Sequence, residues 1–297
     1  MTLLEIQSYI DDIEKNASLY EEKNFDQRME VEDFLGLLVP DQPDQLSLVH
    51  ARTEKVRSEL EEIDKKLFQQ LREGIRRGRY RGTAFNRMVR KYVDFKINGK
   101  DHKVDRSCHG QETGYDNLDA FINGLSLFRP MPEQTKALEP EMVYYQKTPA
   151  RIVFELVEKA HFGKGDVFFD LGSGLGQVAI LVNLLAEITA RGIEFEPAFS
   201  DYARNCAAEL NLSNVTFINV DARAADFSEG TIFFMYTPFQ GEILQAVLAA
   251  LRKESLRRKI KVITYGPCTA QVALQNWLEP ATPEDNNIYK IGIFSSF

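Results

Sequence analysis

The residues best suited to chemistry lie in the stretch from Asp170 to Gln177. A short apolar run over residues 166–169 ends in the acid Asp170, and an apolar helical pattern starts after Gln177. Between them stand Gly172, Ser173, Gly174 and Gly176. This order predicts a strand, a tight turn and a helix N-terminus, where glycines let a ligand approach free backbone N–H groups. The stretch therefore predicts a small-molecule site; the alternative is a turn that only packs a helix on a strand.

The spacing of the glycines narrows the ligand. A dinucleotide-binding turn, G-x-G-x-x-G or A, needs a small residue at position 177, where this chain has Gln177. The pattern that starts at Asp170 is D-x-G-x-G-x-G, which resembles the first motif of class I methyltransferases. Those enzymes bind S-adenosylmethionine (SAM) and release S-adenosylhomocysteine. A carboxylate here suits the ammonium of such an amino-acid cofactor and would repel a pyrophosphate.

Acids at the ends of the next two predicted strands fit the same ligand. Glu194 lies about twenty residues past the glycine turn, where it is placed to accept hydrogen bonds from two ribose hydroxyls. Phe195 would lie against the adenine, and Glu196 is the competing acid. Asp221 is predicted to accept from the adenine amino group while the N–H of Ala222 bonds the ring. Ordinary surface acids are the alternative at both strand ends.

The loop after the fourth predicted strand is expected to hold the methyl acceptor. Methyl transfer is an in-line displacement, so the protein chiefly positions a neutral nucleophile and excludes water. Carbonyl oxygens near Tyr236 and Thr237 would accept N–H bonds from an amine, and Tyr236 or Phe239 would flank it by cation–π contact. The alternative is that these aromatic rings only close the core. The predicted catalytic residues are Tyr236, Thr237, Pro238 and Phe239.

A segment upstream of the first strand is a candidate cover for the cofactor. In Tyr144–Pro149 the polar residues Gln146 and Thr148 are the expected cofactor contacts, unless the segment is a plain interdomain linker. No cluster of cysteines or histidines has the spacing of a metal site. Cys108, Cys206 and Cys268 are therefore expected to be reduced thiols, and no metal is expected.

The hydrophobic pattern divides the chain into two expected domains. Residues 1–135 predict a mainly helical domain with one β-hairpin over residues 92–104, whose role would be to select the substrate or to cover the site. Residues 136–297 alternate strands with helices, which predicts an α/β domain with a mostly parallel, seven-stranded Rossmann-like sheet and helices on both faces. Helices are expected at 3–13, 45–75, 116–128, 149–160, 176–187, 198–210, 240–252 and 269–277, and strands at 166–170, 190–194, 215–220, 231–236, 260–265 and 288–296.

The composition and charge of the chain limit the kinds of partner that it is expected to bind. The chain has 297 residues, 44% of them hydrophobic, and a net charge of −8. No apolar run is long enough to span a membrane and no basic leader precedes one, so a cytoplasmic protein without a membrane partner is expected. Residues 1–64 carry 6 basic and 17 acidic residues, a net of −11, whereas residues 72–106 carry 12 and 4, a net of +8. The basic segment would face nucleic acid or another anionic partner, or lie against the acidic helices or solvent, and the second arrangement is favoured.

The motif sequences resemble one family within this superfamily. Asp166–Val178 is similar almost throughout to the first motif of the disruptor of telomeric silencing family, the histone-lysine methyltransferases that lack a SET domain, and Gly192–Glu194 resembles its ribose-binding strand end. The resemblance covers about residues 141–297. It implies contacts with SAM from Asp170, Gly172, Gly174, Gln177, Glu194 and Asp221.

Two departures from that family concern the substrate. The family carries Tyr-Gly-Glu-Thr where this chain has Tyr145–Thr148, and Asn-Asn-Phe where this chain has Tyr236–Phe239. The second sequence is closer to the Asn/Asp-Pro-Pro-Phe/Tyr loop of amino-group methyltransferases. The expected function is thus N-methylation of a protein side-chain amine. The alternatives are a small-molecule or nucleic-acid methyltransferase, which would use the basic segment for phosphates, and a SAM-binding module without turnover.

Overall fold

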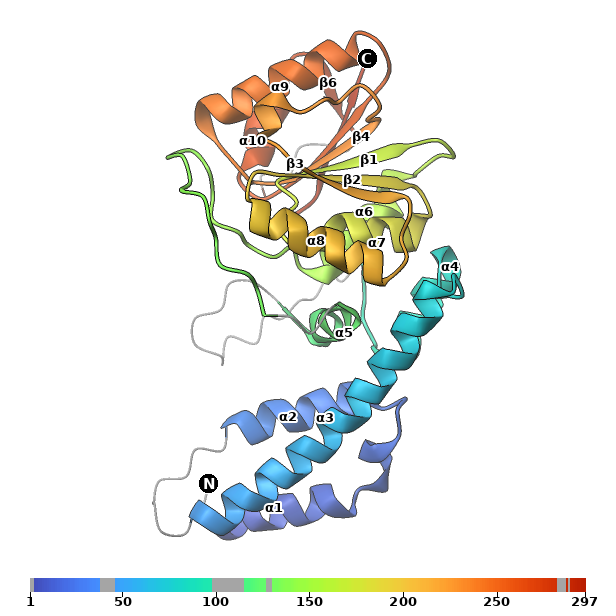
Figure 1. The fold of residues 1–297 in the computed structure, drawn as a ribbon, viewed down its shortest axis with the longest axis vertical. Coiled ribbons are helices and arrows are strands. Elements are labelled where there is room, and N and C mark those ends of the chain that lie inside the picture. The colour runs from blue at the N-terminus through green and yellow to red at the C-terminus, as the bar shows by residue number, and fades with distance from the viewer. Residues whose placement is uncertain (1–2, 38–45, 98–114, 127–129, 282–286, 288) are drawn as a thin grey trace.

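The C-terminal half of the protein is built on one mixed β-sheet. The computed structural model describes residues 3–37, 46–97, 115–126, 130–281, 287 and 289–297 (Figure 1). The strands are β1 (Val167–Leu171), β2 (Thr189–Glu194), β3 (Val215–Asn219), β4 (Ile232–Tyr236), β5 (Lys261–Tyr265), β6 (Leu278–Pro280) and β7 (Gly292–Ser296). Their order in the sheet is β3-β2-β1-β4-β5-β7-β6. The first five are parallel to their neighbours, and β7 runs antiparallel between β5 and β6.

Helices cover both faces of this sheet. One face carries α6 (Ala150–Ala160), α7 (Gln177–Ala186) and α8 (Pro197–Glu209), and the other carries α9 (Gly241–Ser255) and α10 (Cys268–Ala273) (Figure 1). Neighbouring residues of β1 serve the two faces, because Phe168 belongs to the core under α7 and Phe169 to the core under α9. Burial on both sides explains why β1 and β4 are continuous apolar runs. The predicted fold, a mostly parallel, seven-stranded Rossmann-like sheet with helices on both faces, is confirmed.

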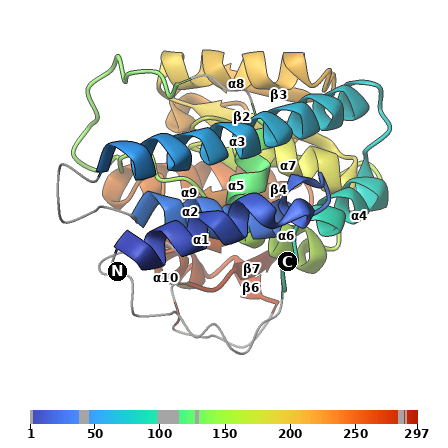
Figure 2. The same ribbon diagram turned by 90° about the horizontal axis from the view of Figure 1, so that it is seen from below.

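The N-terminal part is helical and packs on the same core. It comprises α1 (Leu3–Lys15), η1 (Ala17–Tyr20), α2 (Phe25–Leu37), α3 (Leu46–Arg76), α4 (Gly82–Tyr92) and α5 (Asn117–Leu125). Figure 2 shows α1 and α2 beside the long α3, where they share a small apolar core. At the far end of α3, Phe68 and Phe121 meet edge to face with ring centroids 5.3 Å apart. Helix α5 is thereby held between α3 and the helices on the sheet.

Two α-helices and one strand of the structure are not expected from the sequence. Helix α2 contains the fully buried charge of Arg28, which breaks the amphipathic pattern. Helix α4 begins at Gly82, at the end of a run rich in arginine and glycine. Strand β6 has only three residues and includes Pro280. In each case contacts distant in sequence, rather than local propensity, determine the element.

The predicted hairpin is wrong in its first strand. Tyr92 is the last residue of α4, and residues 93–97 form no strand. Their alternation has another cause, because Val93 and Phe95 are buried and the Phe95 ring packs edge to face on Phe154 of α6, with centroids 4.9 Å apart. The second predicted strand lies outside the described residues.

A buried ion pair ties the first helices together, and it yields a stability prediction. Arg28 Nε donates to Asp64 Oδ1 at 2.8 Å, and its Nη1 donates to the carbonyl of Glu21 at 2.6 Å. Arg28→Met leaves Asp64 buried without its partner, so we expect a loss of about 3–5 kcal/mol in the free energy of unfolding, measured by urea titration.

The matched control is Arg77→Met, which removes an exposed arginine paired with Glu73 and should change stability by less than about 0.5 kcal/mol. Equal losses in the two variants would show that the buried pair has no special part in holding α2 on α3.

Candidate active site

The glycine turn is tied to the neighbouring strand and is closed by an aromatic ring. The backbone N–H groups of Gly172 and Ser173 donate to the carbonyl of Ile193 in β2, at 2.9 and 3.0 Å. Gly174 has φ of +52°, and a Cβ there would overlap the ring of Tyr145. Position 174 therefore requires glycine both for its backbone and for the ring that lies on it.

Two buried carboxylates lie beside the turn. Glu194 Oε2 accepts from the N–H of Gly174 and its Oε1 from the N–H of Glu196, both at 2.7 Å, and each oxygen keeps a further lone pair. Asp170 is fully enclosed, and its Oδ2 has no hydrogen-bond partner among the described residues. Burial, followed by the nearby charge of Glu194, raises the pKa of Asp170 to about 8. The backbone N–H of Ala179 is a hydrogen-bond partner of this carboxylate, but the unpaired Oδ2 favours a cationic ligand at this point.

The competing acid Glu196 has a structural role. Its carboxylate caps α8 through the N–H of Ala198 at 3.0 Å, and it accepts from the N–H groups of Thr135 and Lys136 at 2.9 and 2.8 Å. Although burial opposes it, these hydrogen bonds hold the pKa of Glu196 below its ordinary value. Glu194 therefore stays the better candidate for ribose hydroxyls.

The predicted adenine-binding residues lie at the right strand ends but have other contacts. The Phe195 ring lies under the ammonium of Lys136, with Nζ 4.3 Å from the ring centroid. Asp221 begins the short turn η2 (Ala222–Ala224) and accepts from the backbone and guanidinium of Arg223, which holds its pKa below the ordinary value. Arg223 also pairs with Glu139 at 2.5 Å. No motif marked Arg223, because the Glu139 contact spans 84 residues.

The predicted catalytic loop meets the glycine turn. A Cβ at Gly172 would overlap the ring of Pro238, so the two loops are in direct contact. Thr237 has φ of +38°, a strained conformation for a residue with a side chain, and its Oγ1 donates to the carbonyl of Tyr265 at 3.3 Å. Phe239 is buried in the core under α9, so for this ring the core-closing alternative holds.

Tyr236, the other aromatic residue of the predicted catalytic loop, has tyrosine neighbours that the sequence did not single out. Tyr236 is half-buried, and its ring centroid lies 4.9 Å from that of Tyr265, the last residue of β5. Burial, then the neighbouring phenols of Tyr265, Tyr115 and Tyr289, raise the pKa of Tyr236 to about 12. The phenol of Tyr236 is therefore neutral. Tyr265 had a signal, its place at a strand end beside the loop, whereas Tyr115 and Tyr289 come from distant segments and had none.

The segment 139–149, here called the strap, runs along this edge of the sheet and is fixed at both loops. Met142 pairs with Phe239 in an antiparallel bridge, and the N–H of Val143 donates to the carbonyl of Pro238 at 3.1 Å. Further along, the carbonyl of Thr148 accepts from Gln177 Nε2 at 3.2 Å. Thr148 is buried and Gln146 is exposed. The strap therefore lies against both loops, and its contact with Gln177 is made by the backbone carbonyl of Thr148 rather than by the side chain of Thr148 or Gln146.

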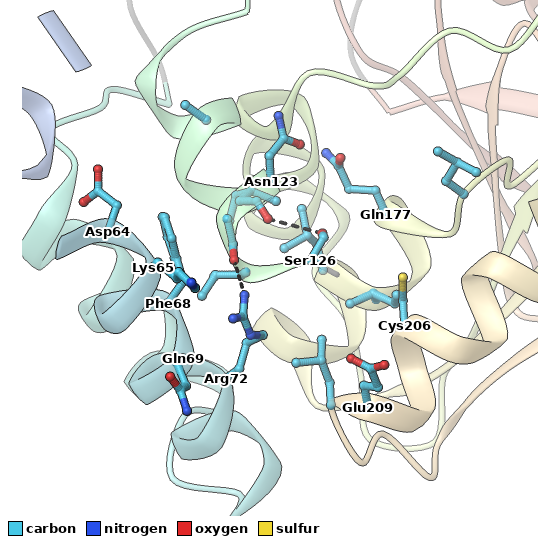
Figure 3. Close-up of a pocket in the computed structure, with 18 of the residues that line it drawn as sticks. Asp64, Lys65, Phe68, Gln69, Arg72, Asn123, Ser126, Gln177, Cys206 and Glu209 are labelled. Atoms are coloured by element: carbon cyan, nitrogen blue, oxygen red, sulfur yellow. Dashed lines mark hydrogen bonds between the residues drawn. The ribbon is translucent and has the colours of Figure 1, made fainter. Parts of the chain in front are cut away.

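A cleft of about 950 Å³ opens beside the strap, between the helical part and the sheet helices (Figure 3). Its walls come from α3, α5, α7 and α8, and they are mostly apolar. Tyr145 and Gln177 line the cleft as well as the glycine turn, and Figure 3 shows Gln177 at its edge. The cleft is therefore continuous with the site at the start of α7.

Other classes of site have little support. Within the part of the chain that the structure describes, no three His, Cys, Asp or Glu side chains are placed to hold a metal ion. Cys206 and Cys268 are buried and form no disulfide, and Cys108 lies outside the described residues. A search of the described helices finds none long and apolar enough to cross a membrane.

Comparison with known proteins agrees with the motif resemblance. The model of the family described as "Histone methylation protein DOT1" matches residues 137–244. These residues contain the strap, the glycine turn, both buried carboxylates and the loop after β4. A search of curated proteins found no match.

Solved structures resemble about half of the chain. An RNA methyltransferase from Salinibacter ruber in complex with S-adenosyl-L-homocysteine has 24% identity and a TM-score of 0.40, over 51% of this chain and 92% of that chain. A SAM-dependent methyltransferase from Aquifex aeolicus has 15% identity and a TM-score of 0.40, over 48% and 88%. A precorrin-6y C5,15-methyltransferase from Geobacter metallireducens GS-15 has 15% identity and a TM-score of 0.38, over 52% and 92%.

The residues at the glycine turn fit SAM. The free oxygen of Asp170 suits the ammonium of the methionine half, and the spare lone pairs of Glu194 suit two ribose hydroxyls. Helix α7 starts directly after the glycine turn, so its first N–H groups lie beside this site, and Gln177 lines the adjoining cleft. The fold, the motif and the family match together indicate SAM as the cofactor.

The enclosed Asp170 makes stability depend on pH. Its pKa in the folded chain, about 8, exceeds the ordinary 3.8, so between these values the folded protein keeps a proton that the unfolded chain releases. The free energy of unfolding therefore falls as the pH rises from about 4 to about 8. Asp170→Asn removes this titration, so its free energy of unfolding should fall less between pH 5 and 8, by on the order of 4 kcal/mol, in urea titrations without ligand.

The control Asp201→Asn removes an exposed carboxylate and should keep the pH slope of the unaltered protein. If Asp170→Asn has that slope too, Asp170 is not the group that holds the proton.

Proposed function

We propose that this chain is a SAM-dependent methyltransferase that methylates the nitrogen of a protein side-chain amine of the lysine kind. The observation that carries the proposal is the free, enclosed oxygen of Asp170 at a glycine turn that also orders Glu194. A turn that only packs a helix on a strand needs neither carboxylate. Burying both costs stability, which a bound cation and two hydroxyl donors would offset.

The loop and the tyrosine cluster suit the acceptor side of the reaction. Bound SAM supplies a methyl group on a positively charged sulfur. The chain's own part is to hold an amine in line with that methyl group and to keep water out. In this proposal the carbonyl oxygens of Tyr236 and Thr237 accept the N–H bonds, and the rings of Tyr236, Tyr265 and Tyr115 enclose the amine.

The amine must lose a proton before it attacks. A free lysine has a pKa of about 10.4, and an apolar surrounding lowers it by disfavouring the ammonium. Burial raises the pKa of Tyr236 and of Tyr265, so both phenols are neutral and provide such a surrounding without adding charge. The N–CH₃ bond then forms as the S–CH₃ bond breaks, and no metal is needed for this step.

The helical part would select the acceptor. We assign this role to residues 1–135 and cofactor binding to residues 136–297, because the cleft lies between them and reaches Tyr145 and Gln177. A protein acceptor is favoured by the family description, which names histone methylation. Phosphate binding by the basic segment is less favoured, because Arg76 and Arg77, at the end of α3, pair with Glu73.

Cofactor binding is tested by calorimetry. We expect SAM to bind the unaltered protein, and Asp170→Ala and Gly174→Val to weaken binding at least thirtyfold, because one removes the ammonium partner and the other displaces Tyr145. The control Asp166→Ala removes an acid next to the first residue of β1, at the end of the strand away from the glycine turn. Its affinity for SAM should stay within twofold of that of the unaltered protein. Unchanged binding in both of the first two variants would rule out this cofactor site.

Transfer is tested with radiolabelled SAM and cell extract, separated into protein, nucleic-acid and small-molecule fractions. We expect label in protein, and Tyr236→Ala to lower it at least tenfold at unchanged SAM affinity, because the ring contacts the acceptor only. Tyr144→Ala, which alters an exposed ring on the strap, is the matched control.

Each other result favours a different function. Label in the nucleic-acid or small-molecule fraction would replace the proposed acceptor. Absence of label in every fraction, with SAM bound, would support the binding module without turnover.

A further inference from the structure

The strap holds one lysine beside the start of α7. The ring of Tyr145 lies on Gly174, and the carbonyl of Thr148 is bonded to Gln177 at 3.2 Å. Lys147 stands between these two attachments, and its own carbonyl accepts from the hydroxyl of Tyr115 at 2.6 Å. The backbone of Lys147 is therefore fixed, and its side chain lines the cleft together with Tyr145 and Gln177.

The ammonium of Lys147 has no ion-pair partner among the described residues. Its side chain is half-buried, and burial lowers its pKa, opposed by the charge of Asp119. Asp119 forms no ion pair with it and instead binds two backbone groups: its Oδ1 accepts from the N–H of Ala150 at 2.8 Å and its Oδ2 from the N–H of Asp116 at 3.3 Å. A half-buried cation without an ion-pair partner on the wall of the cleft is available to an anionic group of a ligand.

The methionine half of the proposed cofactor supplies such a group. It carries an ammonium and a carboxylate on one carbon. Asp170 and Glu194 are both acids, so they suit the ammonium but oppose the carboxylate. Among residues 141–150 and 165–190, which form the strap and the glycine turn with its helix, Lys147 is the only lysine or arginine. The N-terminus of α7 and the amide of Gln177 lie on the same side.

We propose that Lys147 is a positioning residue that binds the carboxylate of the methionine half of SAM. The inference rests on the proposed function and adds which residues bind the ammonium and which bind the carboxylate of the methionine half. Asp170 pairs with the ammonium, whereas Lys147 on the strap and the first turn of α7 bind the carboxylate. Fixing both groups sets the rotation of the methionine chain and so the direction of the methyl group toward the loop after β4.

The experiment compares two ligands by calorimetry. Decarboxylated SAM keeps the ammonium, the sulfonium and the adenosine and lacks only the carboxylate. We expect the unaltered protein to bind SAM at least tenfold more tightly than decarboxylated SAM, as suits one charged hydrogen bond. Lys147→Met should weaken SAM at least tenfold and leave decarboxylated SAM within twofold, so the preference disappears.

Two further variants separate charge from structure. Lys147→Arg keeps the cation and should keep the preference within about threefold. Lys159→Met removes a more exposed lysine on α6 and should leave both affinities unchanged.

Three results would overturn the inference. Equal weakening of both ligands by Lys147→Met would mean that Lys147 only shapes the strap, and unchanged SAM affinity would mean that it does not contact the cofactor. In both cases the unaltered protein still binds SAM, so the proposed function stands. Failure of the unaltered protein to bind either ligand would refute the function and the inference together.

Discussion

The structure depends on two carboxylates held out of water at the ends of β1 and β2. Asp170 is enclosed with one oxygen free, and Glu194 is ordered by the N–H groups of Gly174 and Glu196. Burying these carboxylates lowers the stability of the fold unless a ligand pairs with them. The parallel sheet creates the position, since register pairs Asp170 with Gly192 and Glu194 with Asn219, so that these strand ends lie at one edge. The site is thus a destabilising arrangement that the two apolar cores of the sheet maintain.

The rest of the chain encloses this edge. The strap is bonded to the loop after β4 through Val143 and to α7 through Thr148, and it carries Tyr145 onto the glycine turn. Its far end is anchored in turn, since Asp119 of α5 accepts from the first N–H of α6. Helix α5 packs on α3, so the helical part and the cofactor edge are joined by one continuous core. A change in the helical part is therefore transmitted to the site by direct packing.

The sequence predicted what local chemistry encodes. The alternation of strands and helices, the glycine turn and the acid at each strand end were visible because periodicity and turn residues are local signals. Contacts between distant segments were not visible: Arg223 bound to Asp221 and Glu139, Tyr115 beside Tyr236, and Pro238 against Gly172. Helix α2 was missed because Arg28 is buried against Asp64, 36 residues away. Phe239 was assigned to the acceptor because it is aromatic and near the loop, and only the packing shows that it belongs to the core.

If the ammonium of the cofactor forms an ion pair with Asp170, binding must release the proton that Asp170 holds, and this release is the most direct test of the site. With a pKa of about 8, Asp170 is largely protonated at pH 7 in the free protein. Binding of an ammonium ionises it, so calorimetry in buffers of different ionisation enthalpy should show release of roughly one proton per SAM bound at pH 7, and almost none with Asp170→Asn. Binding without proton release, or release that persists in Asp170→Asn, would contradict this account of the site.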